Sequence, residues 1–554
     1  MSAVVLGTPR HRFAGAGAHP GGAVIVGFQD QGNLGMGYLA STLEKFDHPV
    51  ELIEFRDPAD VTIERVLAAD PVVVGFSLIF QFYLPEYRTL IQRMRAAGVT
   101  AHFTMGGHYP SLCPEEVLEL VPELDSVALY EGEYTLVELT AALRRGEDWT
   151  LVPGLAWTDD AGELVHSPDR GLAEHLDDLP LPMRFKEAER VLGWPTLPLL
   201  ASRGCARRCS FCSIHTFYRG ATGKTVRVRA AAKVAEEMEM LADTQNVRIF
   251  LFQDDDFPLA GRPGQRFVAE LTDEIKRRGL HERAIWKISC RAEYIEPEMF
   301  ATLRDAGMYL VYMGLESGSA EGLEVLNKQI TTETNHYAVA TLKSLGILVE
   351  YGFMLFDPST SFGSIRENIT FLRAILADGS GGAVFCRMLP YGGTPIRERL
   401  RAEGRLRGDV KYPDYDFLDP RLGTYHSLLD AAVSPWIHGA GLSHQLNWAW
   451  HEVFVIRRLV GELPGLAGFE SDLAGLTVRS NEVLFGFVEE TSAAFETGDS
   501  RMLLRHNLRE PRRVLGDELV ELRNDFVADN QDAMLDALMA TDGIHGPVLM
   551  PQVF

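Results

Sequence analysis

Two series of short apolar runs constrain the fold of this 554-residue chain most strongly. The first series places five runs between residues 23 and 130, and the second places six between residues 197 and 389. Segments of helical period separate the runs. Short apolar runs that alternate with such segments are typical of βαβ units, which build parallel sheets. The sequence therefore predicts two successive α/β units.

The two series also suggest a division into domains. The first predicts a flavodoxin-like (Rossmann-type) domain over residues 1–150, and the second a partial (β/α)6 barrel over residues 191–396. Residues 151–190 between them have the composition of a linker, with a hairpin turn at residues 159–162. Residues 397–554 are irregular at first and then helical in pattern, so a C-terminal, mainly helical domain is expected.

Charge and hydropathy argue against several classes of function. A formal net charge of -24 disfavours a protein that tracks nucleic-acid phosphates. The sequence has no run of 18 or more apolar residues and no basic leader followed by an apolar segment. We therefore expect a cytoplasmic protein without a membrane or nucleic-acid partner.

Three of the six cysteines lie within eight positions, in the pattern Cys205-x-x-x-Cys209-x-x-Cys212. This spacing suits metal ligation in a reducing compartment better than a disulfide framework. Three thiolates on a four-iron four-sulfur cluster leave one iron without a protein ligand. That iron can chelate S-adenosylmethionine, and an electron from the cluster then cleaves the sulfonium to give a 5'-deoxyadenosyl radical.

Structural zinc is the alternative for this loop, because His215 could complete a tetrahedral site with the three cysteines. Zinc modules are usually small and poor in strands, whereas these cysteines follow an apolar strand at the mouth of the predicted barrel. The position favours the cluster. The isolated Cys113, Cys290 and Cys386 are expected to be ordinary buried residues.

The cysteine loop, with Phe211 before its last cysteine, resembles the signature of the radical S-adenosylmethionine superfamily. The similarity continues through the ends of the later strands, over most of residues 197–396. The resemblance implies that Cys205, Cys209 and Cys212 hold the cluster. It further implies S-adenosylmethionine contacts at Phe211, Asp254, Asp255, Ser289, Arg291 and Glu316. Ser317 or Ser319, which follow Glu316, could instead cap the next helix.

The unit before the barrel resembles the cobalamin-binding branch of this superfamily. Domains that ligate cobalt through histidine carry Asp-x-His-x-x-Gly after the first strand, and this chain has Asp30, Gly32 and Gly35 at that place. Because Gly32 replaces the histidine, the resemblance implies cobalamin without an imidazole ligand from this loop. It implies further contacts at Ser77, Gly106, Gly107 and His108. A Rossmann-like domain that binds no cofactor is the alternative.

The resemblance implies a cobalamin-dependent methyltransferase that acts on an unactivated carbon of a small molecule, as in natural-product biosynthesis. Its implied partner is a one-electron donor such as flavodoxin or ferredoxin. Two other functions stay open. One is a radical enzyme that uses only hydrogen abstraction, as a dehydratase, epimerase or cyclase, with an empty or structural N-terminal domain. The other is a non-catalytic iron–sulfur or zinc-binding module.

Overall fold

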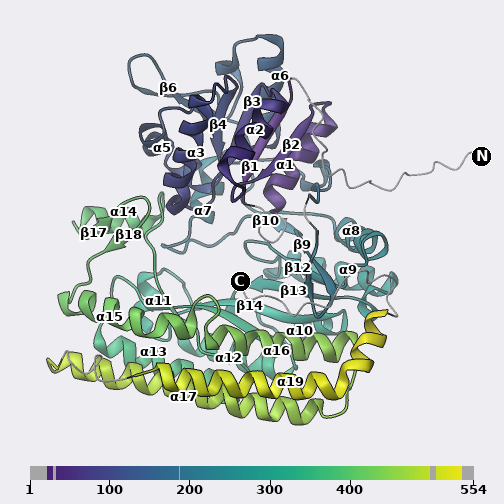
Figure 1. Cartoon of the computed structure of the whole chain (residues 1–554), viewed down its shortest axis with the longest axis vertical. Helices are drawn as coiled ribbons and strands as arrows, with labels where there is room; N and C mark the ends of the chain where they lie inside the picture. The colour runs from purple at the N-terminus through teal and green to yellow at the C-terminus, as the bar shows by residue number, and fades with distance from the viewer. Residues whose placement is uncertain (1–20, 29–32, 186, 500–506, 540–554) are drawn as a thin grey trace, which may run out of the picture.

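The computed structural model describes residues 21–28, 33–185, 187–499 and 507–539. An N-terminal α/β part lies at the top of Figure 1, a second α/β part lies below it, and long C-terminal helices form the base. None of the helices in these residue ranges is long and apolar enough to cross a membrane.

The N-terminal part is built on a seven-stranded sheet with the order β2-β1-β3-β4-β5-β6-β7. Its first five strands run parallel, and each predicted apolar run of the first series forms one of them. This order of the parallel strands confirms the predicted flavodoxin-like arrangement. The strands are β1 (Ala23–Gly27), β2 (Val50–Glu54), β3 (Val73–Ser77), β4 (His102–Gly106), β5 (Ser126–Ala128), β6 (Leu155–Thr158) and β7 (Leu164–His166).

Helices follow the parallel strands of this sheet and enclose two cores, one on each face. They are α1 (Leu34–Lys45), α2 (Ala59–Ala69), α3 (Leu84–Ala96), α4 (His108–Leu112), α5 (Pro114–Leu120) and α6 (Glu133–Arg145). The hairpin predicted at residues 159–162 forms between β6 and β7. Because β6 pairs antiparallel with β5, this hairpin extends the N-terminal sheet.

The second sheet has the order β16-β15-β14-β13-β12-β9-β8 and does not close on itself. Its six strands from β9 to β16 run parallel, which confirms the predicted partial barrel, and β8 pairs antiparallel at one edge. The strands are β8 (Glu189–Val191), β9 (Trp194–Leu199), β12 (Ile249–Phe252), β13 (Ile285–Cys290), β14 (Met308–Glu316), β15 (Leu348–Phe356) and β16 (Cys386–Arg387).

The helices of the half-barrel lie between its strands in the sequence. They are α7 (Ile214–Gly220), α8 (Ala231–Thr244), α9 (Gly261–Arg277), α10 (Pro297–Asp305), α11 (Ala320–Val325), α12 (Thr332–Ser344), α13 (Phe362–Ile375) and α14 (Pro395–Ala402). Two small ribbons complete this part: β10 (Ser202–Arg203) with β11 (Arg227–Val228), and β17 (Leu406–Gly408) with β18 (Pro413–Tyr415).

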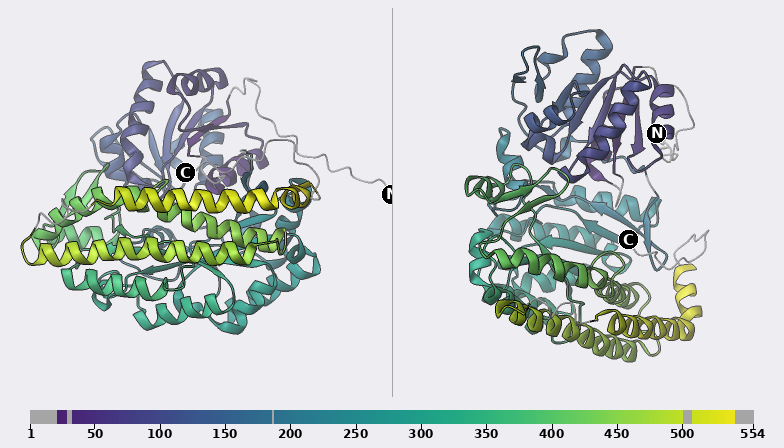
Figure 2. Two further views of the ribbon diagram at one scale, coloured as in Figure 1. Left: turned by 60° about the horizontal axis from the view of Figure 1, so that its bottom comes forward. Right: turned by 60° about the vertical axis from the view of Figure 1, so that its left-hand side comes forward.

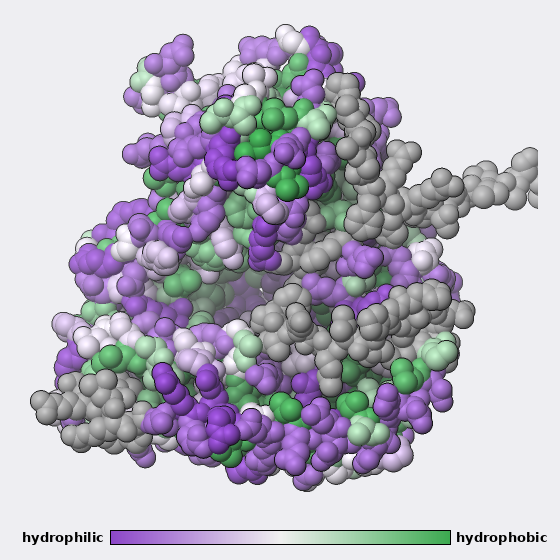
Figure 3. Space-filling view, in the orientation of Figure 1, coloured by the Kyte–Doolittle hydropathy of each residue, from purple (hydrophilic) through white to green (hydrophobic). Residues whose placement is uncertain are grey.

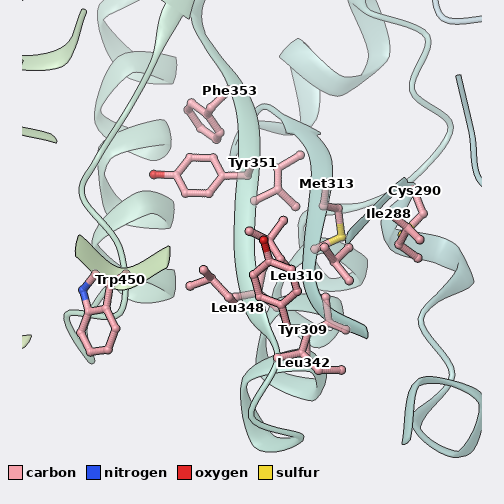
Figure 4. Packing of buried hydrophobic residues seen from close by; sticks show 14 of the residues in the cluster. Ile288, Cys290, Tyr309, Leu310, Met313, Leu342, Leu348, Tyr351, Phe353 and Trp450 are labelled. Carbon is pink, nitrogen blue, oxygen red and sulfur yellow. The ribbon is translucent and has the colours of Figure 1, made fainter. Parts of the chain in front are cut away.

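The C-terminal region is helical, as predicted, with α15 (Pro420–Ile437), α16 (Leu442–Leu459), α17 (Leu466–Glu496) and α19 (Arg509–Met539). Helices α17 and α19 run side by side along the base (Figure 2), and α16 contacts β13 and β15. Buried side chains of these helices, such as Trp436 and Trp450, share one hydrophobic core with strand residues such as Tyr351 (Figure 4). The helices therefore complete the barrel's core.

The isolated cysteines differ in burial. Cys290 is buried as expected and Cys113 is half-buried, but Cys386 is exposed, so the expectation for Cys386 was wrong. Cys386 lies on the edge strand β16, opposite Met354 of β15. Only one neighbouring strand covers it, because the half-barrel stays open at this edge.

Candidate active site at the cysteine loop

The cysteine loop begins directly after β10 and is folded back on itself. The Cys212 backbone N–H donates to the Cys209 carbonyl oxygen at 3.3 Å. All three cysteines are free, and the charges of Cys209 and Cys212 act on the Cys205 thiol. The Arg207 backbone N–H points to the Cys205 sulfur at 3.4 Å. The fold thus brings the three predicted ligands together.

Two of the loop's thiols, Cys205 and Cys212, have raised pKa values. Burial raises the pKa of Cys205 and of Cys212 to about 12, so both are neutral thiols until a metal displaces the proton. Beside them, Arg291 donates to the Cys209 sulfur at 3.2 Å.

The spacing of possible ligands bears on the choice between zinc and a cluster. In the described part of the chain, no three His, Cys, Asp or Glu side chains are grouped so that they could hold a single metal ion, and His215 on α7 joins no such group. In a cluster, each thiolate binds a different iron, so its ligands stand farther apart than those of one zinc ion. The arrangement fits a cluster better than zinc.

Three successive aspartates after β12 reach three different environments. Asp254 is 4% exposed and is held by the chain itself, since it accepts from the Ser202 hydroxyl at 2.5 Å and from the Ala201 N–H at 3.2 Å. Burial raises its pKa to about 7. Asp255 accepts from the Gly204 N–H at 2.8 Å, one residue before Cys205.

Asp256 lies beside the cysteine loop itself. Its Oδ2 atom is 3.6 Å from the Cys205 sulfur, and its Oδ1 atom is buried without a hydrogen-bond partner. Burial raises the pKa of Asp256 to about 6. An unpartnered buried carboxylate oxygen is rare in folded proteins and marks a place where a ligand donor is missing.

The end of β14 carries strained backbone. Glu316 has a φ of 65°, in the left-handed region that non-glycine residues seldom adopt, and its buried carboxylate lies 3.2 Å from Lys328 Nζ. A Cβ at Gly314 would lie 2.3 Å from Glu316 Oε1, so only glycine leaves room for this pair. Such strain gathers at functional sites. Ser319, by contrast, caps α11 by accepting from the Gly322 N–H at 3.1 Å.

A cavity of about 640 Å³ lies at the carboxyl ends of the N-terminal strands. Of the predicted cofactor contacts, it is lined by Gly35, Ser77, Gly106, Gly107 and His108, whereas Asp30 and Gly32 lie outside the described residues. Gly107 has a φ of 114°, and a Cβ there would lie 2.1 Å from the Leu78 carbonyl oxygen. Side-chain-free backbone thus forms part of the cavity wall.

A smaller cavity of about 170 Å³ lies between this space and the cysteine loop. Its walls include Phe211 and Cys212, while Ile79, Phe80 and His108 line both cavities. Figure 3 shows the surface hollowed between the upper and lower parts of the molecule. The edge of the N-terminal sheet and the cysteine loop therefore face each other across apolar side chains.

Comparison with known families agrees with both halves of this geometry. The family model described as B12 binding domain matches residues 22–140, and the model described as Radical SAM superfamily matches residues 199–372. The chain belongs to the radical S-adenosylmethionine superfamily. It is a cobalamin-dependent member, and its cofactors are a four-iron four-sulfur cluster, S-adenosylmethionine and cobalamin.

Two relatives and one solved structure are similar to this chain. The radical S-adenosylmethionine enzyme described here is 27% identical to an uncharacterized methyltransferase of Pyrococcus horikoshii over 440 residues, covering 77% of this chain and 92% of that one. It is 28% identical to the anaerobic magnesium-protoporphyrin IX monomethyl ester cyclase of Rubrivivax gelatinosus over 370 residues, covering 65% of this chain and 63% of that one. The cobalamin-dependent S-adenosylmethionine radical enzyme OxsB, solved with aqua-cobalamin and S-adenosylmethionine bound, has the same fold, with a TM-score of 0.65. The two chains are 18% identical, and the match covers 94% of this chain and 83% of that one.

The residues present in this radical S-adenosylmethionine enzyme fit its cofactors. Three free thiols on one folded loop are the donor set that a cluster with one open iron requires. The orphaned Asp256 oxygen lies beside them. The larger cavity is mainly apolar and has glycine backbone at its rim, which allows close approach of a large planar cofactor.

Some functional candidates were missed from the sequence. Asp256 and Lys328 were not predicted as site residues, although Asp256 belongs to the same acidic run as Asp254 and Asp255. Arg291 and Glu316 lie beside the loop, to which Phe211 belongs, and the contact of these three residues with S-adenosylmethionine stays a prediction. Ser289, the residue before the last of β13, is half-buried, and its carbonyl oxygen accepts from the Phe257 N–H at 2.9 Å.

Proposed function

We propose that this enzyme is a methyltransferase that acts on an unactivated carbon of a small molecule, as in natural-product biosynthesis. The observation that carries the proposal is that the two cavities share the wall residues Ile79, Phe80 and His108. A substrate held there would be within reach of both the cobalamin cavity and the cysteine loop. Methyl transfer needs such a shared space, because the radical and the methyl group come from different cofactors.

The chain's own residues would bind and shield these cofactors. When bound, the cluster with S-adenosylmethionine supplies a hydrogen-abstracting radical and cobalamin supplies the methyl group. In our proposal Cys205, Cys209 and Cys212 hold the cluster, and Asp256 with the Glu316 and Lys328 pair meets the charged methionyl end of S-adenosylmethionine. Ile79 and Phe80 would exclude water from the shared space and so protect a radical from side reactions.

The inner face of the half-barrel offers polar contacts for the substrate. Tyr312 is 40% exposed although it lies on β14, a central strand, which indicates open space in front of it. Ser289 and Glu350 flank it at the same level on the neighbouring strands. Lys287 Nζ is 5.8 Å from the centre of the Tyr312 ring. A small molecule with hydroxyl or ionised groups suits this surface.

The relatives support methyl transfer and also name an alternative. The Pyrococcus horikoshii relative is named a methyltransferase, whereas the Rubrivivax gelatinosus relative is named a cyclase. Hydrogen abstraction followed by ring formation is therefore the second candidate. Either reaction needs an electron for the cluster, and we propose a flavodoxin or ferredoxin as the donor.

An isotope experiment separates the two reactions. The anaerobic holoenzyme, with a reduced flavodoxin, is incubated with a small-molecule extract of the cells that make it and with S-adenosylmethionine labelled with ¹³C in its methyl group. Methyl transfer predicts a new metabolite that carries the label, found by mass spectrometry. An unlabelled new product formed together with 5'-deoxyadenosine would instead assign hydrogen-abstraction chemistry.

A further inference from the structure

The ribbon that precedes the cysteine loop places two arginines opposite each other. In the antiparallel register of β10 and β11, Arg203 pairs with Arg227. Both side chains are buried, at 10% and 2% exposure. Directly opposed like charges destabilise a strand pair, and more so away from water. This ribbon of two residues per strand cannot hold its own register without a compensating anion.

The compensating anion comes from the N-terminal part of the chain. Glu131 accepts from Arg203 at 3.0 Å and from Arg227 at 2.6 Å and 2.9 Å. Glu133 accepts from Arg203 at 2.7 Å. Although burial opposes ionisation, the two guanidinium groups hold the pKa of Glu131 below its usual value. Glu131, which bridges both arginines, and Glu133, which binds Arg203, thus offset the repulsion within the ribbon.

Strained backbone aims Glu131 at the ribbon. Tyr130, which precedes it after β5, has a φ of 60°, and its N–H donates to the Ser111 hydroxyl at 2.8 Å. A tyrosine in the left-handed region persists only where the surroundings over-determine it. Glu131 also accepts from the Ala173 N–H at 3.0 Å, so its carboxylate is held from both sides.

The ribbon leads directly into Cys205, the first of the proposed cluster ligands. Gly204 follows Arg203 and precedes Cys205; its φ is 89°, and a Cβ there would lie 1.9 Å from the Thr225 carbonyl oxygen. The backbone therefore turns sharply from the ribbon to the ligand. Glu131 and Arg203 also line the larger cavity, so the same ion pair touches the cobalamin site.

We propose that Glu131 is a positioning residue for the iron–sulfur cluster, acting from the cobalamin-binding part through the Arg203 and Arg227 ribbon. The docking of that part then holds Cys205 in its ligating position. This inference rests on the proposed ligation of the cluster by the three cysteines, but it does not depend on methyl transfer.

The test measures cluster retention in anaerobically reconstituted full-length enzyme. We expect Glu131→Gln to release iron to a ferrous chelator at least about tenfold faster than the wild type, the size of effect typical when a residue behind a metal ligand is removed. Arg227→Met, which does not line the cobalamin cavity, should behave in the same way. Glu131→Asp keeps the charge and should recover part of the retention.

A spectroscopic readout separates positioning from general stability. Electron paramagnetic resonance of the reduced cluster, recorded before and after addition of S-adenosylmethionine, should show a weakened or altered response in Glu131→Gln. Glu237→Gln is the matched control, because Glu237 also bridges two buried arginines, Arg184 and Arg229, but lies within the barrel. It should lower the melting temperature and leave this response intact.

Two results would overturn the proposal: wild-type iron release and spectra in both Glu131→Gln and Arg227→Met, or the same spectral change in Glu237→Gln. Undiminished iron in a Cys205→Ala variant would refute the cluster assignment beneath it instead. Normal iron behaviour of the wild type without any methylated product would refute only the proposed methyl transfer.

Discussion

Asp256 holds one carboxylate oxygen 3.6 Å from the sulfur of Cys205 and buries the other oxygen without a partner. The Cys205 thiol donates to the first oxygen, and this donor is lost when the thiol gives up its proton to bind iron, so the carboxylate then needs another donor. The methionyl amino group of S-adenosylmethionine carries N–H donors of the right kind for this place. We therefore assign to Asp256 a contact that the sequence pattern placed on Asp254 and Asp255.

Asp256→Asn should weaken S-adenosylmethionine binding, because it removes a charged acceptor. Charge-assisted hydrogen bonds contribute about 1.5 to 3 kcal/mol, so the KM for S-adenosylmethionine in 5'-deoxyadenosine formation should rise about ten- to a hundredfold. Asp254→Asn is the control. Its carboxylate is occupied by Ser202 and Ala201, so this variant should lose stability with little change in KM. The reverse pattern would return the contact to Asp254.

Replacing any one of Cys205, Cys209 and Cys212 by alanine should abolish 5'-deoxyadenosine formation and lower iron content after reconstitution. The reason is that each thiolate binds one iron of the cluster, so the loss of any one weakens the hold on the cluster and alters its open site. Iron, sulfide and product are measured together. Cys113→Ala, which removes a half-buried thiol that lines neither cavity, should match the wild type. Full activity in a loop variant would contradict the assignment.

Gly107→Ala should lower cobalamin content and leave the iron content unchanged. The new Cβ would meet the Leu78 carbonyl oxygen at 2.1 Å and force apart the wall of the larger cavity. Gly98→Ala is a matched control: its φ is 91°, so it carries similar strain of about 1 to 3 kcal/mol, yet a Cβ there meets nothing within 4 Å. The measurement is the cobalt content per chain. An equal loss of cobalt in both variants would refute a role of this wall in cobalamin binding.

Buried His451 should make one contribution to a loss of stability in mild acid. The His451 ring on α16 is hydrogen-bonded to the Tyr309 hydroxyl on β14, and burial lowers its pKa from 6.5 to about 4. His451 therefore takes up a proton near pH 6.5 in the unfolded chain, whereas in the folded chain it stays neutral until about pH 4. This favours unfolding progressively across that window, by up to about 3 kcal/mol.

The control for this pH effect is His451→Gln, which keeps a polar side chain that does not titrate. Its thermal midpoint should fall less than that of the wild type between about pH 7.5 and about pH 5, although it starts lower. Parallel pH curves for the two proteins would show that His451 does not contribute to acid sensitivity.

Local pattern was enough to predict the strands and the cysteine loop. Each apolar run is bounded by turn residues, and the three cysteines share one short segment, so neither needs long-range information. Asp254, Asp255 and Asp256 show where such prediction ends. They are adjacent and alike in the sequence, but each accepts from a different donor: Asp254 from Ser202 of β10, Asp255 from Gly204, and Asp256 from Cys205.

Contacts across long stretches of chain decide the rest of the site. The surroundings of His108, for which the resemblance implied a cobalamin contact, come from a distant segment: the Phe217 ring packs against it at 4.5 Å, and burial lowers its pKa. Glu131 gains its role only because Arg203 and Arg227 meet it from more than 70 residues away. No local periodicity carries such information.

The most direct test of the account is the amount of 5'-deoxyadenosine formed by reduced, anaerobically prepared enzyme whose iron and cobalt have been counted. We expect about four irons and one cobalt per chain, with 5'-deoxyadenosine released from S-adenosylmethionine by the wild type but not by Cys205→Ala. A protein that binds metal yet never cleaves S-adenosylmethionine under these conditions would contradict it.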